Sequence, residues 1–414
     1  MTATQCGVHQ RSNVVPRTRC IAATAGRLGL ALVVGLAVSS AGCGGGGNVS
    51  DAGTGVAGTT GVAGTTGVAG TTGVAGTTGA AGTTGVAGRG GTTGAAGTTG
   101  PGGAAGPLSP PAGGYGLRAM LLASNSEMAV GEVNGKIYVV GGYPTSPTAT
   151  VDTVLVYDVA ANTWSMGPRH PIAVHHPVVV GVSGRLYSLG AQTASADTGR
   201  TFELDPGTGL WRELATMPTA RGAGAAAVIG DKIYVAGGRP PAGNAFEAYD
   251  ISDNTWTALA DFPQTFADRN HLAAGALGNK VYVAGGRYDG GGFSSPRTDS
   301  LDIFDPATGA WTQGARMLRP RGGVNGAFAL GCFHVWGGEG TNTGEPNDVF
   351  PDHDVYDPRN DTWTQLAPLP TPVHGVTGAA FVGGLIYMPG GGTMSGGSSG
   401  SNILQVYRPD RSCE

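Results

Sequence analysis

Short runs of apolar residues, four to seven long, follow one another from about residue 115 to the end of the chain. They are bounded by Gly, Asn and Asp and are rich in Val, Ile and Tyr, as β-strands are. Pairs such as Asn134-Gly135 and Gly278-Asn279 stand directly before some of these runs, where a hairpin needs a tight turn. No stretch of this region has the period of an amphipathic helix. The pattern therefore predicts an all-β domain built of antiparallel hairpins.

One six-residue phrase, IYVVGG at 137–142, returns five times along this domain. Its copies follow at intervals of 47 to 53 residues and stand at 186–191, 233–238, 281–286, 333–338 and 386–391. In five of the six repeats a second mark follows, an aromatic residue or Leu with a Trp seven positions later, at Trp164, Trp211, Trp256, Trp311 and Trp363. Self-similarity at this period indicates a repeat architecture in which each unit is one four-stranded sheet.

The combination of IYVVGG, the aromatic residue and the Trp resembles the kelch family across nearly all of 115–414. The second repeat departs from the pattern, with Gly190-Ala191 in place of the diglycine. The resemblance implies a six-bladed kelch-type β-propeller. The sixth repeat reaches the chain end before its Trp, and Tyr115 stands where that Trp belongs when counted back from the first phrase. We therefore expect the segment Tyr115–Ala123 to supply the outer strand of the last blade and to close the ring.

The chain before the propeller is predicted to direct export. Residues 1–27 contain four arginines and no acid, and an apolar run over 28–38 has the length of a signal-peptide core. The sequence Ser-Ser-Ala-Gly before Cys43 resembles the lipobox of bacterial lipoproteins, in which the Cys carries the lipid. Ordinary secretory cleavage is the alternative. Residues 1–43 are thus assigned as signal peptide, and the protein is expected at the outer membrane or cell surface, or, without a lipid, in the periplasm or outside the cell.

Residues 44–114 form a Gly/Thr-rich stalk in which every third residue from Gly55 to Gly106 is Gly. That G-X-Y period is typical of collagen, and a triple helix would make the protein a trimer. The scarcity of proline, with Pro101 and Pro107 alone near the end of the repeat, favours a flexible tether and a monomer.

Charge and cysteine content narrow the classes of function. The net charge is −4 and the isoelectric point about 6.1, so no basic field predicts nucleic-acid binding. The five cysteines include no CxxC pair, so no zinc motif is present. Cys332 and Cys413 fall in turns of adjacent blades on the face opposite the channel mouth, and we expect them to form a disulfide if the protein is exported.

Arginines gather at the predicted mouth of the channel, where the loop before the first strand meets the residue after the diglycine. The first position holds Arg221, Arg269, Arg321 and His374, and the second holds Arg239, Arg287 and Glu339. Guanidinium groups bind carboxylates through paired hydrogen bonds, so these residues predict an acidic ligand. The alternative is that arginines at the first position only brace backbone carbonyls.

The leading functional interpretation is a binding propeller for a protein or an acidic carbohydrate. The alternative is an enzyme on acidic sugars, resembling the sialic-acid epimerases of the kelch family, with Glu339 as general base. A copper oxidase resembling galactose oxidase is disfavoured, because both propeller cysteines lie away from the mouth. His170, His175 and His176 share one loop and are expected to be solvated, so neither a metal nor a cofactor is predicted.

Overall fold

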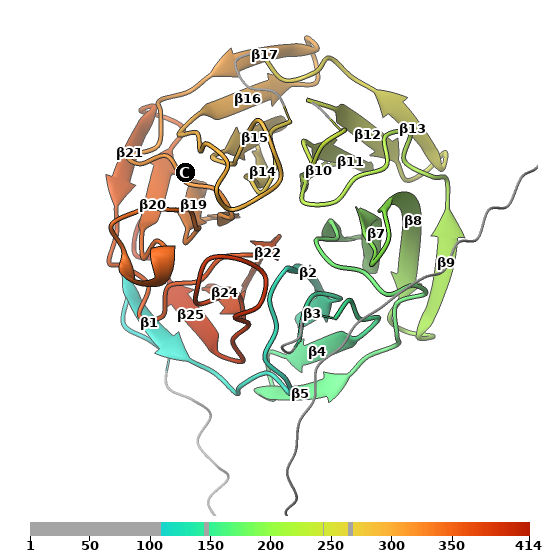
Figure 1. Ribbon diagram of the computed structural model, residues 1–414, viewed down its shortest axis with the longest axis horizontal. Helices are drawn as coiled ribbons and strands as arrows, with labels where there is room; N and C mark the ends of the chain where they lie inside the picture. Colours follow the sequence, from blue (N-terminus) through green and yellow to red (C-terminus); the bar gives the residue numbers. More distant parts are fainter. Residues whose placement is uncertain (1–108, 145–148, 243, 264–267) are drawn as a thin grey trace, which may run out of the picture. The chain divides into compact units, whose positions relative to one another are not determined.

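A computed structural model describes residues 109–144, 149–242, 244–263 and 268–414. The signal sequence, Cys43 and the Gly/Thr repeat up to residue 108 lie outside the described residues. Six antiparallel sheets are arranged around a centre, with their first strands innermost (Figure 1). The structure confirms the six-bladed β-propeller. Among the described residues, no helix has the length and apolar content needed to cross a bilayer.

Five blades are four-strand meanders that run outward from the channel in chain order. Blades one to three consist of β2 Met128–Val133, β3 Lys136–Val140, β4 Val154–Asp158 and β5 Thr163–Met166; β6 Val179–Val182, β7 Arg185–Gln192, β8 Asp197–Asp205 and β9 Leu210–Leu214; and β10 Ala225–Ile229, β11 Lys232–Ala236, β12 Phe246–Asp250 and β13 Thr255–Ala258. Blades four and five consist of β14 Ala273–Leu277, β15 Lys280–Ala284, β16 Leu301–Asp305 and β17 Ala310–Gln313; and β18 Asn325–Ala329, β19 Cys332–Trp336, β20 His353–Asp357 and β21 Thr362–Gln365. One 3₁₀ turn, η1 Pro346–Asp348, interrupts the long loop of blade five.

The sixth blade takes its outer strand from the other end of the domain. It contains β23 Ala380–Val382, β24 Leu385–Pro389, β25 Leu404–Arg408 and β1 Gly114–Leu117. Strand β1 pairs antiparallel with β25 and sets Tyr115 opposite Tyr407, and Figure 1 shows the two strands side by side. A further short strand, β22 Val376–Thr377, pairs in parallel with β2 of blade one. Blades six and one are therefore joined at both their inner and outer edges.

The repeated tryptophans join each blade to the one before it. Each indole Nε1 donates a hydrogen bond of 2.8 to 3.1 Å to a carbonyl at the end of the preceding blade, at Ala119, Pro168, Ala215, Ala260 and Ala315. The indole therefore buries its ring between two sheets while its one polar atom is satisfied. The Trp spacing found in the sequence is the spacing of this blade-to-blade contact.

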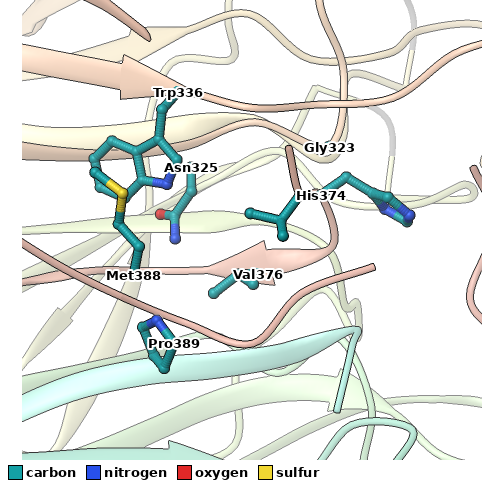
Figure 2. Close-up of a pocket in the computed structure, with 8 residues that line it drawn as sticks. Gly323, Asn325, Trp336, His374, Val376, Met388 and Pro389 are labelled. Carbon is teal, nitrogen blue, oxygen red and sulfur yellow. The ribbon is translucent and has the colours of Figure 1, made fainter. Parts of the chain in front are cut away.

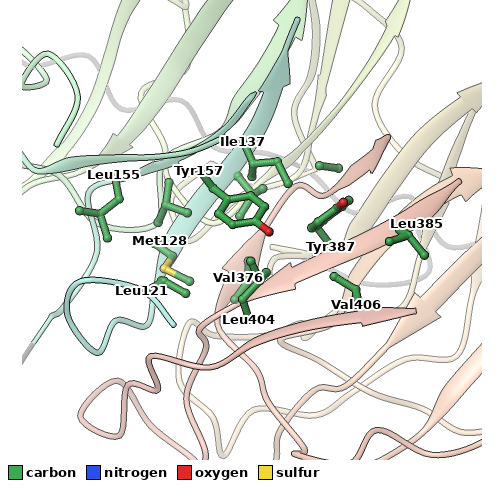
Figure 3. Close-up of a cluster of buried hydrophobic side chains, with 13 residues drawn as sticks. Leu121, Met128, Ile137, Leu155, Tyr157, Val376, Leu385, Tyr387, Leu404 and Val406 are labelled. Carbon is green, nitrogen blue, oxygen red and sulfur yellow. The ribbon is translucent and has the colours of Figure 1, made fainter. Parts of the chain in front are cut away.

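The core lies between neighbouring sheets, where side chains of strands two and three interdigitate. At the closing interface Tyr157 of blade one packs against Tyr387 of blade six, with ring centroids 5.9 Å apart. Figure 3 shows this cluster, which also contains Met128, Leu121 and Val406. All of these side chains are nearly fully buried.

The diglycine is required by a close approach between blades. A Cβ on Gly141 would lie 2.4 Å from the carbonyl oxygen of Val174 in the next blade, and one on Gly337 would lie 2.2 Å from that of Val373. Both glycines also have positive φ, 65° and 66°. In blade two only the first glycine is kept, and a register shift between Leu189 and Ala191 accommodates the alanine.

Candidate functional site

The loop before the first strand does meet the residue after the diglycine, but the residues that pair there directly follow the predicted arginines. Isolated backbone bridges join Ser126 to Tyr143, His175 to Gln192, Asn270 to Arg287, Gly322 to Glu339 and His374 to Gly392. In blade three Arg239 N–H donates to Gly222 O at the corresponding place. The mouth is thus built from short, hydrogen-bonded loop segments.

Next to these bridges lies a belt of residues in the left-handed conformation, one per blade. Its six members have φ between 50° and 71° and are Glu127, His176, Ala223, His271, Gly323 and Gly375. Four of their junctions carry a hydrogen bond of 2.7 to 2.9 Å from the N–H of one member to the carbonyl of the preceding one, running from Glu127 round to Gly323. Non-glycine residues seldom adopt this conformation, and its recurrence around the channel indicates that the ring geometry imposes it. We call these six residues the left-handed belt.

Three belt residues place ionisable side chains together near the axis. Glu127 Oε2 lies 2.7 Å from His176 Nε2, and the His176 and His271 rings meet edge to face with centroids 4.9 Å apart. Glu127 is 4% exposed, His176 3% and His271 7%. Burial raises the pKa of Glu127, but the adjacent His176, followed by His374 and Arg287, lowers it below its ordinary range. The carboxyl is therefore ionised in an enclosed site.

A second acid completes the cluster from the adjoining row. Glu339 Oε1 lies 3.0 Å from an Nη of Arg287 and 3.3 Å from His374 Nδ1, while Glu339 Oε2 accepts the N–H of Gly396 at 2.6 Å. Both oxygens are occupied and the residue is 1% exposed. This environment does not suit the hypothesis that Glu339 acts as a general base, because a substrate could not reach a free oxygen.

Arg221, Arg269 and Arg321 do not form an open anion site. Each is at most 2% exposed, and their guanidinium groups pair with Glu247, Asp302 and Asp354 of the same blade. Each also donates to backbone carbonyls, as Arg269 does to Gly285 at 2.8 Å. The interpretation of these three as ligand-binding is wrong, because they are buried, their charge is neutralised and most of their donors are used inside the blade. They are the braces that the alternative described.

The sequence contained a signal for these braces. The paired acid stands two residues before the third-strand aromatic in each of the three blades, before Tyr249, Phe304 and Tyr356. In the blades without an arginine the same position holds Leu155, Phe202 and Gln405. The arginine and the acid therefore occur together, repeat by repeat.

The position of His374 also differs from the expectation. It bridges Gly392 and so corresponds to Asn270 of blade four rather than to Arg269, and Val373 takes the arginine's place. The inner strand of blade six is broken at Gly378, where a Cβ would lie 2.4 Å from Val130 O. This break changes the residue spacing in blade six, so the spacing of the other blades pointed to His374 in place of Val373. His374 is 1% exposed, and its Nε2 lies 2.7 Å from Met394 O.

A gap beside His374 is too small to be a ligand site. It lies among Trp336, Val376 and Met388, has a volume of about 10 Å³ and could hold at most one water. Figure 2 shows the His374 ring turned away from Trp336 and Met388. The histidine therefore belongs to the mouth rather than to this gap.

Arg239 is the mouth arginine with room for a ligand. It lines a cavity of about 420 Å³ together with Glu127, Tyr143 and His176, under the loops that carry Phe293 and Ser395–Ser398. Within the described part of the chain no carboxylate lies within ion-pair distance of Arg239, and its Nε has no hydrogen-bond partner. Its one hydrogen-bond contact, from an Nη to His176 Nε2, is long at 3.4 Å. Arg287, by contrast, is 1% exposed and paired with Glu339.

The loop histidines are buried, contrary to the expectation that they are solvated. His170 and His175 are 3% and 7% exposed, and burial lowers the pKa of His170 to about 4 and that of His175 to about 3. His170 packs in blade two against Phe202 and Trp211, away from the belt. The site residues missed from the sequence are Glu127 and His271, which share a repeat position with His176, two residues after the position of the brace arginines.

Cys332 and Cys413 are bonded, with an S–S distance of 1.98 Å and Cα atoms 5.0 Å apart. The bond joins the β18–β19 hairpin of blade five to the last residues of the chain. The C-terminal segment after β25 is thereby held against the neighbouring blade.

Six radial sheets with a polar cluster at one end of a central channel define a single-ring β-propeller. The model of the KLHDC2/KLHL20/DRC7 Kelch-repeats domain matches residues 126–313 and 175–392, and the chain belongs to the kelch-repeat family. Kelch propellers are typically protein-interaction modules.

Among curated proteins, the chain is similar to the Kelch-like protein terF of Aspergillus terreus, with 30% identity over 310 residues, 68% of this chain and 64% of that protein. It is 32% identical over 148 residues to Kelch-like protein 41a of Danio rerio, 35% of this chain and 25% of that one. It is 26% identical over 240 residues to human Kelch-like protein 23, 57% of this chain and 40% of that one. The chain thus spans less than two thirds of each relative.

Proposed function

We propose that this chain is a binding module that takes a carboxylate-bearing ligand, from a protein or an acidic carbohydrate, on Arg239 in the mouth cavity. The single observation that carries the proposal is the unpaired state of Arg239 beside a cavity of about 420 Å³. A ligand carboxylate would supply the acceptors that the guanidinium lacks, through charge-assisted hydrogen bonds worth about 1.5–3 kcal/mol each.

The surroundings of Arg239 suit a ligand with both apolar and polar surface. Tyr143 stacks on His175 with centroids 4.6 Å apart and presents an aromatic face to the cavity. Phe293 is 42% exposed at the rim, and Ser395 and Ser398 provide hydroxyl groups. Two aromatic side chains beside charged and hydroxyl groups suit a ligand that has both apolar and polar parts.

The proposal includes export from the cell and lipid attachment at Cys43. The support from sequence is the apolar run at 28–38 followed by Ser-Ala-Gly-Cys. The support from the structure is the Cys332–Cys413 bond, because disulfides persist mainly in oxidising compartments. A propeller presented outside the cell would meet carboxylate-bearing polymers and proteins.

Isothermal titration calorimetry tests the ligand class. The probes are galacturonate, N-acetylneuraminate and a short peptide with a free C-terminus, each compared with its neutral ester or amide. We expect an acid to bind the wild type and Arg239→Ala to weaken that binding at least ~10-fold, the loss of one charge-assisted hydrogen bond. Arg212→Ala is the matched control, because Arg212 lies on an outer strand and pairs with Glu203. Equal binding of the neutral probes, or full binding by Arg239→Ala, would overturn the proposal.

A further inference from the structure

The belt histidines leave a lone pair facing the centre of the site. His271 Nδ1 lies 2.6 Å from Asn270 Oδ1, an acceptor, so the proton of the neutral ring is on Nδ1. The Asn270 amide is held in this orientation by its own donations to the carbonyls of Asp268 and Gly290, at 2.6 and 2.8 Å. Consequently His271 Nε2 is unprotonated, and it is a buried atom with no hydrogen-bond partner among the described residues.

His176 can present a second nitrogen lone pair to the same site. Its Nδ1 lies 2.6 Å from Nδ1 of His175, and its Nε2 faces Glu127 Oε2 at 2.7 Å. When His176 donates from Nδ1 to His175, its Nε2 lone pair faces the Glu127 carboxylate; when His175 donates instead, His176 Nε2–H donates to that carboxylate. In the first tautomer the two atoms repel unless a cation lies between or beside them, so a bound metal ion would select that tautomer. Arg239 approaches the same nitrogen only at 3.4 Å.

From this geometry we propose that Glu127, His176 and His271 form a binding site for one first-row divalent transition metal ion, of which Zn²⁺ is the reference. Their three ligand atoms lie within 4.8 Å of one another. Shifts of less than ~1 Å would bring them to the metal–ligand distances of about 2.0–2.2 Å found at zinc. Two imidazoles and one carboxylate are an established donor set for zinc, one that leaves a coordination position open.

The surroundings favour this site over the neighbouring group of Glu127, Glu339 and His374. There, Glu339 is already paired with Arg287 at 3.0 Å, whereas at the proposed site Arg239 makes only a long 3.4 Å contact with His176 and would have to move aside for a cation. At the proposed site, Asn270 fixes the His271 proton on Nδ1 and His175 holds Nδ1 of His176, the outer-shell support that metal-binding histidines need. Glu127 and His176 also line the mouth cavity, so the open position would face a ligand. The earlier expectation of no metal rested on treating the histidines as solvated.

Metal binding is tested on the full chain, stripped with chelator and without any acidic ligand, so that failure here leaves the Arg239 proposal untouched. Equilibrium dialysis against Zn²⁺ should give one ion per chain. His271→Gln should lower the affinity at least ~100-fold, since even outer-shell changes cost about 10–100-fold, and Asn270→Ala should lower it within that smaller range. His170→Gln is the matched control, a buried histidine outside the cluster, and should bind as the wild type does.

Cobalt absorption and a further variant check the assignment without relying on the folding of His271→Gln. Co²⁺ bound to the wild type should show the visible bands of a four- or five-coordinate ion, and His374→Gln should retain them. Absence of stoichiometric binding by the wild type would overturn the proposal. Binding lost in His374→Gln but kept in His271→Gln would also overturn it, by assigning the ion to the neighbouring group.

Discussion

Acidification should weaken the propeller through His170, which is buried as a neutral ring. Its Nδ1 lies 2.7 Å from Ile172 O, its Nε2 lies 3.2 Å from the Ser188 hydroxyl, and its ring is edge-on to Phe202 and Trp211. Burial lowers its pKa to about 4, with a smaller contribution from the charge of Arg200. The perturbation considered is a change from pH 7.5 to pH 5.0, in wild type and in His170→Gln.

The direction of the stability change with pH follows from which state, folded or unfolded, binds the proton. Between the unfolded pKa of about 6.5 and the folded pKa of about 4, the unfolded chain is protonated at this histidine and the folded chain is not. Stability from His170 is therefore fully present above pH 6.5 and is lost as the pH falls towards 4. At pH 5.0 the loss is about 2 kcal/mol, which is about 1.4 kcal/mol for each of the ~1.5 pH units below 6.5.

This loss of stability is measured by urea unfolding in the presence of chelator, followed by tryptophan fluorescence. Glutamine preserves a donor and an acceptor, so its packing cost appears equally at both pH values and cancels. The fall in unfolding free energy between pH 7.5 and 5.0 should be smaller in His170→Gln by about 2 kcal/mol. If both proteins lose the same stability, His170 is not a buried neutral ring and the reasoning fails.

Three further predictions concern the braces, the closing strand and the anchor. Arg269→Ala should cost about 3–5 kcal/mol of unfolding free energy, because Asp302 is left buried and unpaired, while Arg239→Ala should cost under 1 kcal/mol; similar costs would refute the distinction. Deleting residues 44–124 should lower the melting temperature, because β25 loses its outer neighbour, whereas deleting 44–108 should leave it unchanged; equal melting would contradict closure by β1. Fatty-acid analogue labelling should mark the wild type and not Cys43→Ala, and equal labelling would remove the case for a lipid anchor.

The fold was predictable because repetition multiplies a weak local signal. A single IYVVGG phrase shows only a strand ending in glycines, but six copies at a nearly constant interval define the ring. The position of Tyr115 was likewise predictable, since it stands where a sixth Trp would, and it pairs with Tyr407 in the structure. Spacing carries such information because equivalent residues in each blade have equivalent neighbours.

The site was predicted less well because side-chain partners are set across the blade and not along the chain. The repeat spacing placed five arginines at the channel mouth. It did not show that Asp302 neutralises Arg269 or that Arg239 lacks such an acid. The left-handed belt was missed because histidine and glutamate there give no local sign of positive φ, as the glycines do. Its geometry arises from ring closure, which no single repeat contains.

In the left-handed belt, the side chains that could bind a ligand are independent of the backbone contacts that hold the fold. Backbone hydrogen bonds hold the belt, so a change of side chain there leaves the ring's connections intact. Ala223 already has the required φ of 59° with a Cβ in place, so it is a position where evolution or design could add a donor. Gly375 is closed to this, because a Cβ there would lie 2.8 Å from the Glu127 carboxylate. One propeller backbone could in this way support binding, metal coordination or neither, according to the residues at a few equivalent positions.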